Sequence, residues 1–219
     1  MAASDSANST RRYRVALVGI VVYVVLDAVA QVLPPHYSPI SQAESDLAVG
    51  PYGFIMTINF LNRGLLSLEF LFGLLATIRL AGGDVANFRL GKYLFGVWSV
   101  GALLLAVFPT DVPPTPVSWH EAIHLVVAVL AFLGGAFGAL TISLRMSSVP
   151  SLKGVRRVAL PLSVLSVSAC VVELLVSSAR YGGLIERFFL GTVLLWIACV
   201  SGYMLTHKVK LEAPIPKQA

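Results

Sequence analysis

The sequence predicts an all-α fold, an integral membrane bundle of six transmembrane helices with both termini on the cytoplasmic side. Three observations lead to this prediction. The 219 residues are 57% hydrophobic and only 12% charged, well below the charged share of about 25% in soluble domains. The apolar residues form separate runs, each close to the roughly 20 residues needed to cross a hydrocarbon core. The basic residues gather in alternate connections between these runs.

Each apolar run is interpreted as one helix. The predicted spans are 13–33, 54–80, 91–109, 119–145, 158–179 and 184–206. Proline and glycine pairs, which typically interrupt helices, mark most of the connections: Pro34-Pro35, Gly82-Gly83, Pro113-Pro114 and Gly182-Gly183. The predicted organisation is therefore a disordered cytoplasmic arm over 1–12, a transmembrane domain over 13–206, and a cytoplasmic tail over 207–219.

The distribution of basic residues gives the orientation. Thirteen of the sixteen Lys and Arg residues lie in the N-terminal arm, the second and fourth connections, and the tail. The alternate connections hold only Arg180 and Arg187, and Arg63 lies inside a span. The positive-inside rule then places both termini in the cytoplasm of a multi-pass protein of the cell membrane. The net charge of +5 is interpreted as a topology signal, so the bilayer is the expected partner and nucleic acid is not.

The first span also has features of a secretory signal peptide. Basic residues precede it, and Ala28-Val29-Ala30 resembles a cleavage site. However, its apolar stretch is long, it contains Asp27, and its removal would leave an odd number of spans. We expect a retained helix, although the sequence alone leaves cleavage open.

Ionisable residues near the predicted outer ends of the spans indicate a site. Such residues are costly in a membrane and are functional-site hypotheses by default. At 1.5 Å per residue, nearly all of them fall within about 15 Å of the outer ends. The candidate pocket residues are Asp27, Asp46, Arg63, His124, Glu173, Glu186 and Arg187. The alternative is that Asp27 or Glu173 pairs with Arg63 to join helices. Clustering in one leaflet favours an outward-facing pocket.

The segment His120-Glu121-Ala122-Ile123-His124 matches the H-E-x-x-H pattern of zinc hydrolases. A zinc ion would need a third ligand, for which Asp111 is a candidate, alongside Asp46 and Glu173. However, Ser118 and Glu121 also form a capping-box pattern, which by itself explains the glutamate. We expect no cofactor, with zinc held by His120, His124 and Asp111 as the alternative.

The first outer loop carries a family resemblance. Ser41 and Glu44 form a second capping-box pattern, which predicts a short interfacial helix near 42–48. The sequence around it reads Tyr37-Ser38-Pro39-Ile40, then Ser45-Asp46-Leu47 and Gly50. With Asp27, Gln31, Phe108-Pro109-Thr110-Asp111, His124, Gly183-Leu184, Glu186-Arg187 and Trp196, these residues resemble the prokaryotic family called domain of unknown function 998 (DUF998). A fainter likeness is to the Frag1/DRAM/Sfk1 six-span proteins. The resemblance implies six helices and membrane residence, and brings no activity.

Three functions are compatible with these residues. The favoured one is binding or handling of a lipid head group or small polar ligand, with Arg63 and Arg187 holding an anionic group. The first alternative is a membrane-embedded, metal-dependent hydrolase that uses His120, His124 and a carboxylate. The second is a structural or assembly subunit, suggested by Gly134-x-x-x-Gly138, although that pattern more often serves packing within one bundle. The residues favour a non-enzymatic role without deciding it, and they leave the oligomeric state open.

Overall fold

The computed structural model describes residues 2–34, 36–112, 116–176 and 180–207. Its six long helices are α1 (Ala2–Val32), α2 (Gly53–Leu80), α3 (Arg89–Leu105), α4 (Trp119–Arg145), α5 (Lys153–Val176) and α6 (Gly182–Thr206). Short 3-10 helices lie in the connections: η1 (Glu44–Ala48), η2 (Val85–Phe88), η3 (Met146–Ser148) and η4 (Pro150–Leu152). Among the described residues, six helices are long and apolar enough to cross a membrane, which confirms the all-α class with six membrane-spanning helices. The cytoplasmic location of both termini stays a prediction.

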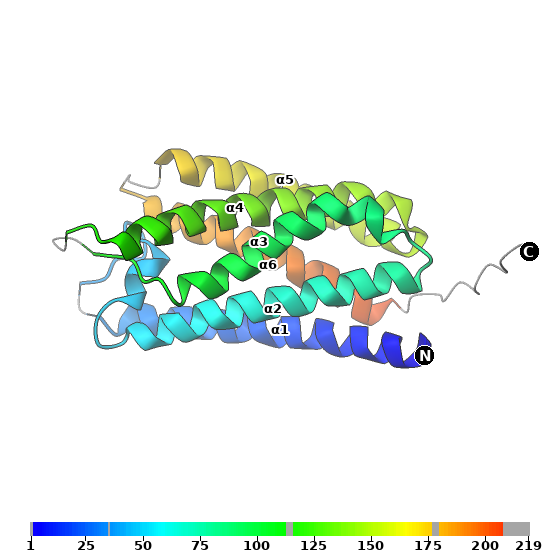
Figure 1. Ribbon diagram of the computed structural model, residues 1–219, viewed down its shortest axis with the longest axis horizontal. Helices are drawn as coiled ribbons and strands as arrows, with labels where there is room; N and C mark the ends of the chain where they lie inside the picture. Colours follow the sequence, from blue (N-terminus) through cyan, green and yellow to red (C-terminus); the bar gives the residue numbers. More distant parts are fainter. Residues whose placement is uncertain (1, 35, 113–115, 177–179, 208–219) are drawn as a thin grey trace, which may run out of the picture.

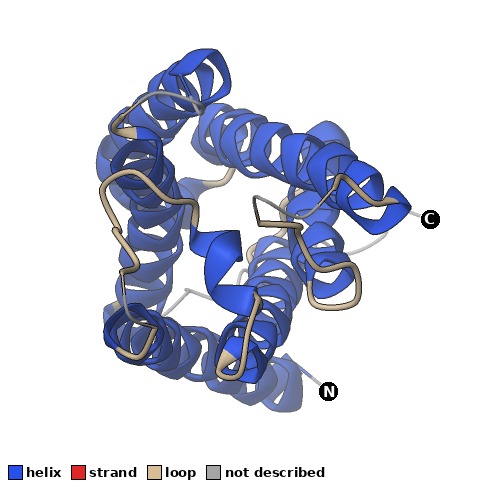
Figure 2. Ribbon diagram, turned by 90° about the vertical axis from the view of Figure 1, so that its left-hand side faces the viewer, coloured by secondary structure: helices blue, strands red, loops and turns tan. Residues whose placement is uncertain are grey.

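The long helices form a closed ring. Each packs against the next along the chain, and α6 packs against α1 to complete the circle (Figure 2). The beginning of α1 and the end of α6 therefore lie at the same end of the bundle (Figure 1), which we call the terminal end. The connections that follow α1, α3 and α5 lie at the opposite end, which we call the loop end. The short helix η1 lies at the loop end and contacts α1, α2 and α6.

The predicted element boundaries differ from the structure in several places. Helix α1 begins at Ala2, so the prediction of a disordered arm is wrong over the described residues of that arm. The reason is tertiary: Arg12 pairs with Glu69 of α2 at 2.8 Å, and the Tyr13 hydroxyl bonds Thr77. Helix α3 ends at Leu105 instead of residue 109, and α5 begins at Lys153 instead of 158. Residues 177–179 of the predicted fifth span, and the tail beyond 207, lie outside the described residues.

Two buried tryptophans organise the middle of the bundle. The Trp196 ring meets the rings of Phe70 and Phe95 with centroids 5.1 and 5.4 Å apart. Its Nε1 donates a hydrogen bond to the Ser143 hydroxyl at 2.9 Å. The Nε1 of Trp98 donates to Ser67 at 3.0 Å. Each buried indole N–H thus has a partner, as expected where water is absent.

The glycine pair of α4 packs against α3. A Cβ atom at Gly134 would lie 2.5 Å from the Leu94 carbonyl oxygen, and one at Gly138 would lie 2.7 Å from the Phe95 nitrogen. Side chains of any size would therefore separate the two helices. The Gly134-x-x-x-Gly138 motif serves packing within the bundle, so it gives no support to a partner-binding role.

Candidate functional site

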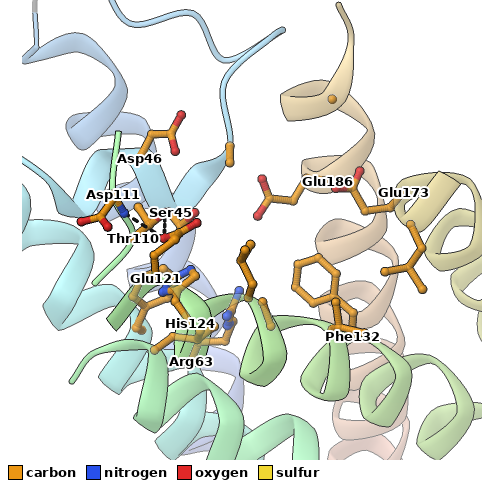
Figure 3. A pocket seen from close by; sticks show the side chains of 18 residues that line it. Ser45, Asp46, Arg63, Thr110, Asp111, Glu121, His124, Phe132, Glu173 and Glu186 are labelled. Atoms are coloured by element: carbon orange, nitrogen blue, oxygen red, sulfur yellow. Dashed lines mark hydrogen bonds between the residues drawn. The ribbon is translucent and has the colours of Figure 1, made fainter. Parts of the chain in front are cut away.

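A cavity of about 270 Å³ lies inside the bundle near the loop end (Figure 3). Its polar lining residues are Ser45, Asp46, Arg63, Thr110, Asp111, Glu121, His124, Glu173 and Glu186. Its apolar lining includes Leu105, Leu125, Ala128, Val129, Phe132 and Leu174. Five of the seven residues predicted for a pocket line this one: Asp46, Arg63, His124, Glu173 and Glu186. We call it the acidic pocket, because carboxyl groups dominate its polar lining.

The other two predicted residues, Asp27 and Arg187, do not line the acidic pocket. They pair with each other, with 3.9 Å between the Arg187 Nη2 and the Asp27 Oδ1. The Arg187 Nη1 also donates to the carbonyl oxygens of Pro39, Gln42 and Gly183 at 3.1–3.2 Å. Arg187 thereby fastens the segment 37–44, which we call the strap, to the start of α6.

Further contacts fix the strap in place. The Leu184 nitrogen donates to the Ile40 carbonyl at 3.0 Å, and a Cβ atom at Gly183 would collide with the Gln42 carbonyl oxygen. The Tyr37 hydroxyl donates to the Ala43 carbonyl at 2.8 Å and is itself bonded by Arg187. Burial raises the pKa of Tyr37 well above its usual range, so this hydroxyl stays protonated and available as a donor.

The strap brings a carboxylate to Arg63 that the sequence did not point to. Arg63 and Glu44 are each 1% exposed, and their Nη1 and Oε2 atoms are 3.4 Å apart. The guanidinium also lies over the rings of Phe60 and Trp98, at 5.2 and 5.0 Å from their centroids. The predicted pairing of Arg63 with Asp27 or Glu173 is therefore wrong. An anchored loop supplies the counter-charge.

Glu44 is the centre of a buried polar network. The Tyr23 hydroxyl donates to its carboxylate, and its backbone nitrogen donates to Glu186 Oε2 at 2.8 Å. The expected capping box at Ser41 is not formed, because η1 begins after Ala43 and has no side-chain cap. The short helix near 42–48 does exist, as η1, but Glu44 turns inward instead of capping it.

A second network supports the opposite wall. Glu121 Oε2 accepts hydrogen bonds from the Thr110 hydroxyl and the Asp111 nitrogen, both at 2.8 Å. Ser118 caps α4 as expected, since its hydroxyl accepts from the Glu121 nitrogen at 3.3 Å. Asp111 accepts from the Ser118 nitrogen at 2.6 Å, and this bond lowers the pKa of Asp111. The Glu121 carboxylate thus binds the segment that follows α3, at Thr110 and Asp111, and does not complete the capping box with Ser118.

His124 presents one ring nitrogen to this wall and leaves the other available. Its Nδ1 lies 2.7 Å from the Phe108 carbonyl oxygen, which only accepts, so Nδ1 carries the proton and Nε2 is an acceptor. His120 instead stacks on Trp119, with ring centroids 3.5 Å apart. Over the described part of the chain, no group of three or more His, Cys, Asp or Glu side chains is arranged to hold a metal ion. The zinc alternative stays a prediction.

The ionisable groups that line the acidic pocket are mostly acidic. Its lining holds five carboxyl groups: Asp46, Asp111, Glu121, Glu173 and Glu186. Arg63 supplies the single guanidinium among the described lining residues, and Glu44 already pairs with it. Glu173 Oε2 is buried with no hydrogen-bond partner in the part of the chain that the structure describes. Burial raises the pKa of the Asp46 carboxyl group above its ordinary value of 3.8. Such a site attracts positive charge.

Comparison with known protein families gives a match over most of the chain. The family model described as "Protein of unknown function (DUF998)" matches residues 17–203, which include all of the acidic pocket. No curated protein and no solved structure matches the chain. The match confirms the resemblance found in the sequence, and its description names no ligand or reaction.

Proposed function

The chain belongs to the DUF998 family of membrane proteins, and we propose that it binds an amine or ammonium head group in the acidic pocket. One observation carries this proposal: among the described lining residues, five carboxyl groups face one guanidinium, which is already paired. A positive head group would relieve the mutual repulsion of these carboxyl groups. It would also give Glu173 the partner that its buried oxygen lacks among the described residues.

The sign of the ligand charge differs from the sequence-based expectation. Arg63 and Arg187 were expected to hold an anionic group. Arg63 is instead compensated by Glu44, and Arg187 by Asp27 and three carbonyl oxygens. Because neither guanidinium keeps an uncompensated charge for a ligand, an anion would meet mainly carboxyl groups. Its binding would carry a desolvation penalty with little electrostatic return.

The acidic pocket also suits a ligand with an apolar part. Glu173 and Glu186 lie on one side of it, and Asp46 lies with Asp111 on the other (Figure 3). Below them the lining turns apolar, with Leu125, Ala128 and Phe132 of α4. A head group held among the carboxyl groups would therefore place an attached hydrocarbon chain against α4. This division of polar and apolar lining is typical of sites that fix a ligand's orientation.

The proposal is tested with two probes that share a hydrocarbon chain and differ in charge. Butylammonium should bind the purified protein saturably in a calorimetric titration, whereas pentanoate should not. Glu173→Gln and Glu186→Gln should each weaken ammonium binding about tenfold, which corresponds to about 1.4 kcal/mol. Glu69→Gln is the matched control, because Glu69 pairs with Arg12 on the opposite half of the bundle. Pentanoate binding, or no butylammonium binding to the folded protein, would overturn the proposal.

No observation on the described residues specifically favours the hydrolase or the assembly role. A hydrolase would need zinc bound by His120 and His124, and stoichiometric zinc in the purified protein is the measurement that would revive it. The glycine motif gives no support to an assembly role, because Gly134 and Gly138 pack against α3. Location in the cell membrane in particular stays a prediction.

A further inference from the structure

The wall of the acidic pocket between α4 and α5 is only one side chain thick. Leu125 and Val129 of α4 and Leu174 of α5 all line the cavity. The same three side chains are 53%, 42% and 37% exposed. A residue that both lines a cavity and faces outward separates the two by its own width. Outside a membrane-spanning bundle at this depth lies lipid.

These residues lie at the level of a single leaflet. With a rise of 1.5 Å per residue, Leu125 is about 9 Å and Val129 about 15 Å below the start of α4. Leu174 is about 3 Å from the end of α5. All three therefore lie in the half of the bundle next to the loop end. The wall covers the depth at which lipid head groups give way to acyl chains.

The carboxyl group that lacks a partner lies next to this wall. Glu173 precedes Leu174 on α5, and its buried Oε2 finds no hydrogen-bond partner among the described residues. Glu173 itself is only 6% exposed, so it faces the cavity while its neighbour faces outward. A molecule passing the wall would meet this carboxyl group first.

The loop end is covered, by contrast, by an anchored segment. Ala43, Ser45 and Asp46 line the acidic pocket from the strap and η1. The strap is fastened to α6 by the Arg187 hydrogen bonds and by the bond between Leu184 and Ile40. Entry from that side would require several of these bonds to break. A molecule entering between α4 and α5 would meet apolar side chains, whose rotation is a fast motion.

We infer that the ligand is a membrane lipid with an amine-bearing head group, which enters the acidic pocket sideways between α4 and α5. The inference rests on the proposed function and adds the source of the ligand. The amine reaches Glu173 and Glu186, and the acyl chains stay in the bilayer beside Leu125, Val129 and Leu174. A water-soluble amine of the same charge would share the head-group contacts but would not need this route.

The test uses the full chain in nanodiscs that contain a trace of lipid with a photoactivatable acyl chain. Phosphatidylethanolamine and phosphatidylglycerol are compared, because both have a phosphate and only the first has an amine. We expect phosphatidylethanolamine to be captured at least fivefold more than phosphatidylglycerol, with crosslinks at Leu125, Val129 and Leu174. Equal capture of the two lipids, or crosslinks spread evenly over α1 to α6, would overturn the inference.

Substitutions in the wall test the route itself. The pair Val129→Trp and Leu174→Trp should lower phosphatidylethanolamine capture at least fivefold. The pair Val126→Trp and Val172→Trp is the matched control, because these residues face outward on the same helices and do not line the cavity. Opening the wall with Val129→Ala and Leu174→Ala should raise capture, which keeps the test valid if the tryptophan pair fails to fold. Equal capture by the alanine pair and the control pair would contradict the lateral route.

Binding of butylammonium separates the proposed cation site from the lateral lipid route. If the wild-type protein binds this soluble cation but shows no preference for phosphatidylethanolamine, the lateral lipid route is wrong and the acidic pocket is still a cation site. If the folded wild-type protein binds neither, the proposed function itself is wrong.

Discussion

The two halves of the bundle bury polar groups in different ways. Toward the terminal end, the buried partners are neutral, as where Trp196 donates to Ser143. Toward the loop end they are charged, as where Arg63 meets Glu44. Trp98 lies at the boundary, because its ring lies under the Arg63 guanidinium and its Nε1 donates to Ser67. One helix face of α2 therefore changes from charged to neutral within a single turn.

This difference separates stability from function. Neutral hydrogen bonds between buried side chains hold a membrane bundle together at a small desolvation cost. Buried charges are expensive in the same surroundings, so a group of carboxyl groups that are only partly compensated is poorly explained by packing alone. The terminal half thus acts as the scaffold, and the loop-end half holds the acidic pocket, for which we propose a ligand.

The largest effect is expected when the charge of Arg63, at the centre of the loop-end half, is removed. Arg63→Met leaves Glu44 buried without its cation, and losing one partner of a buried pair typically costs about 3–5 kcal/mol. We expect a large fall in thermal unfolding temperature in detergent. Adding Glu44→Gln to this variant should restore most of the loss, because no charge is then left unpaired. Equal stability of the single and double variants would show that the pair is not coupled.

The scaffold half responds to volume instead of charge. Gly138→Leu forces a side chain against the Phe95 backbone, and overpacking of this kind costs about 1–3 kcal/mol. Gly96→Leu is the control, since a Cβ atom there meets nothing within 4 Å. Thermal unfolding should show a loss for the first variant and none for the second. Ammonium binding to the folded fraction should be unchanged in both.

A neutral partner in the scaffold half should contribute less than the buried ion pair. Trp196→Phe removes the hydrogen bond to Ser143 and keeps most of the ring packing. A double-mutant cycle with Ser143→Ala should give a coupling free energy of about 0.5–1.5 kcal/mol. A coupling as large as that of Arg63 with Glu44 would remove the distinction between the two halves.

The smallest effect is expected at the half-buried carboxyl group of the loop end. Burial raises the pKa of Asp46, so the folded state favours its protonated form. This preference stabilises the folded state fully below the ordinary Asp pKa of 3.8. The stabilisation is lost as the pH rises through the raised pKa of Asp46 in the folded state. Asp46→Asn should therefore be slightly more stable than the wild type at pH 7 and equal to it below pH 3.8. A variant less stable at pH 7 would contradict this.

The parts of the fold that depend on local sequence were predictable. The fourth span was predicted over 119–145, and α4 occupies these residues because Ser118 caps it as its sequence pattern indicates. The Gly134-x-x-x-Gly138 motif of this helix packs within the bundle, as its pattern indicated. Both features depend on residues close together in the chain, where spacing alone determines which side chains share a face.

The errors came from contacts between distant segments. Glu44 fits a capping box by spacing, yet it pairs with Arg63, which is 19 residues away. The strap folds inward because Arg187 holds it, across almost 150 residues of chain. The one sequence signal for Glu44 was an unpaired arginine inside a span, which requires a counter-charge from some other segment. Asp27 and Arg187 were predicted to line the pocket, but they pair with each other, and Arg187 anchors the strap.

The length of α1 has a practical consequence for labelling. Its 31 residues extend about 46 Å, whereas the hydrocarbon core is about 30 Å thick. The helix is therefore longer than a perpendicular crossing of that core needs, and the pair Arg12 and Glu69 joins its first half to α2. We expect a fluorophore attached at Asn8 to give sharp distance distributions to the membrane surface, because Asn8 lies on this helix. Those distances would decide on which side of the membrane the start of α1 lies.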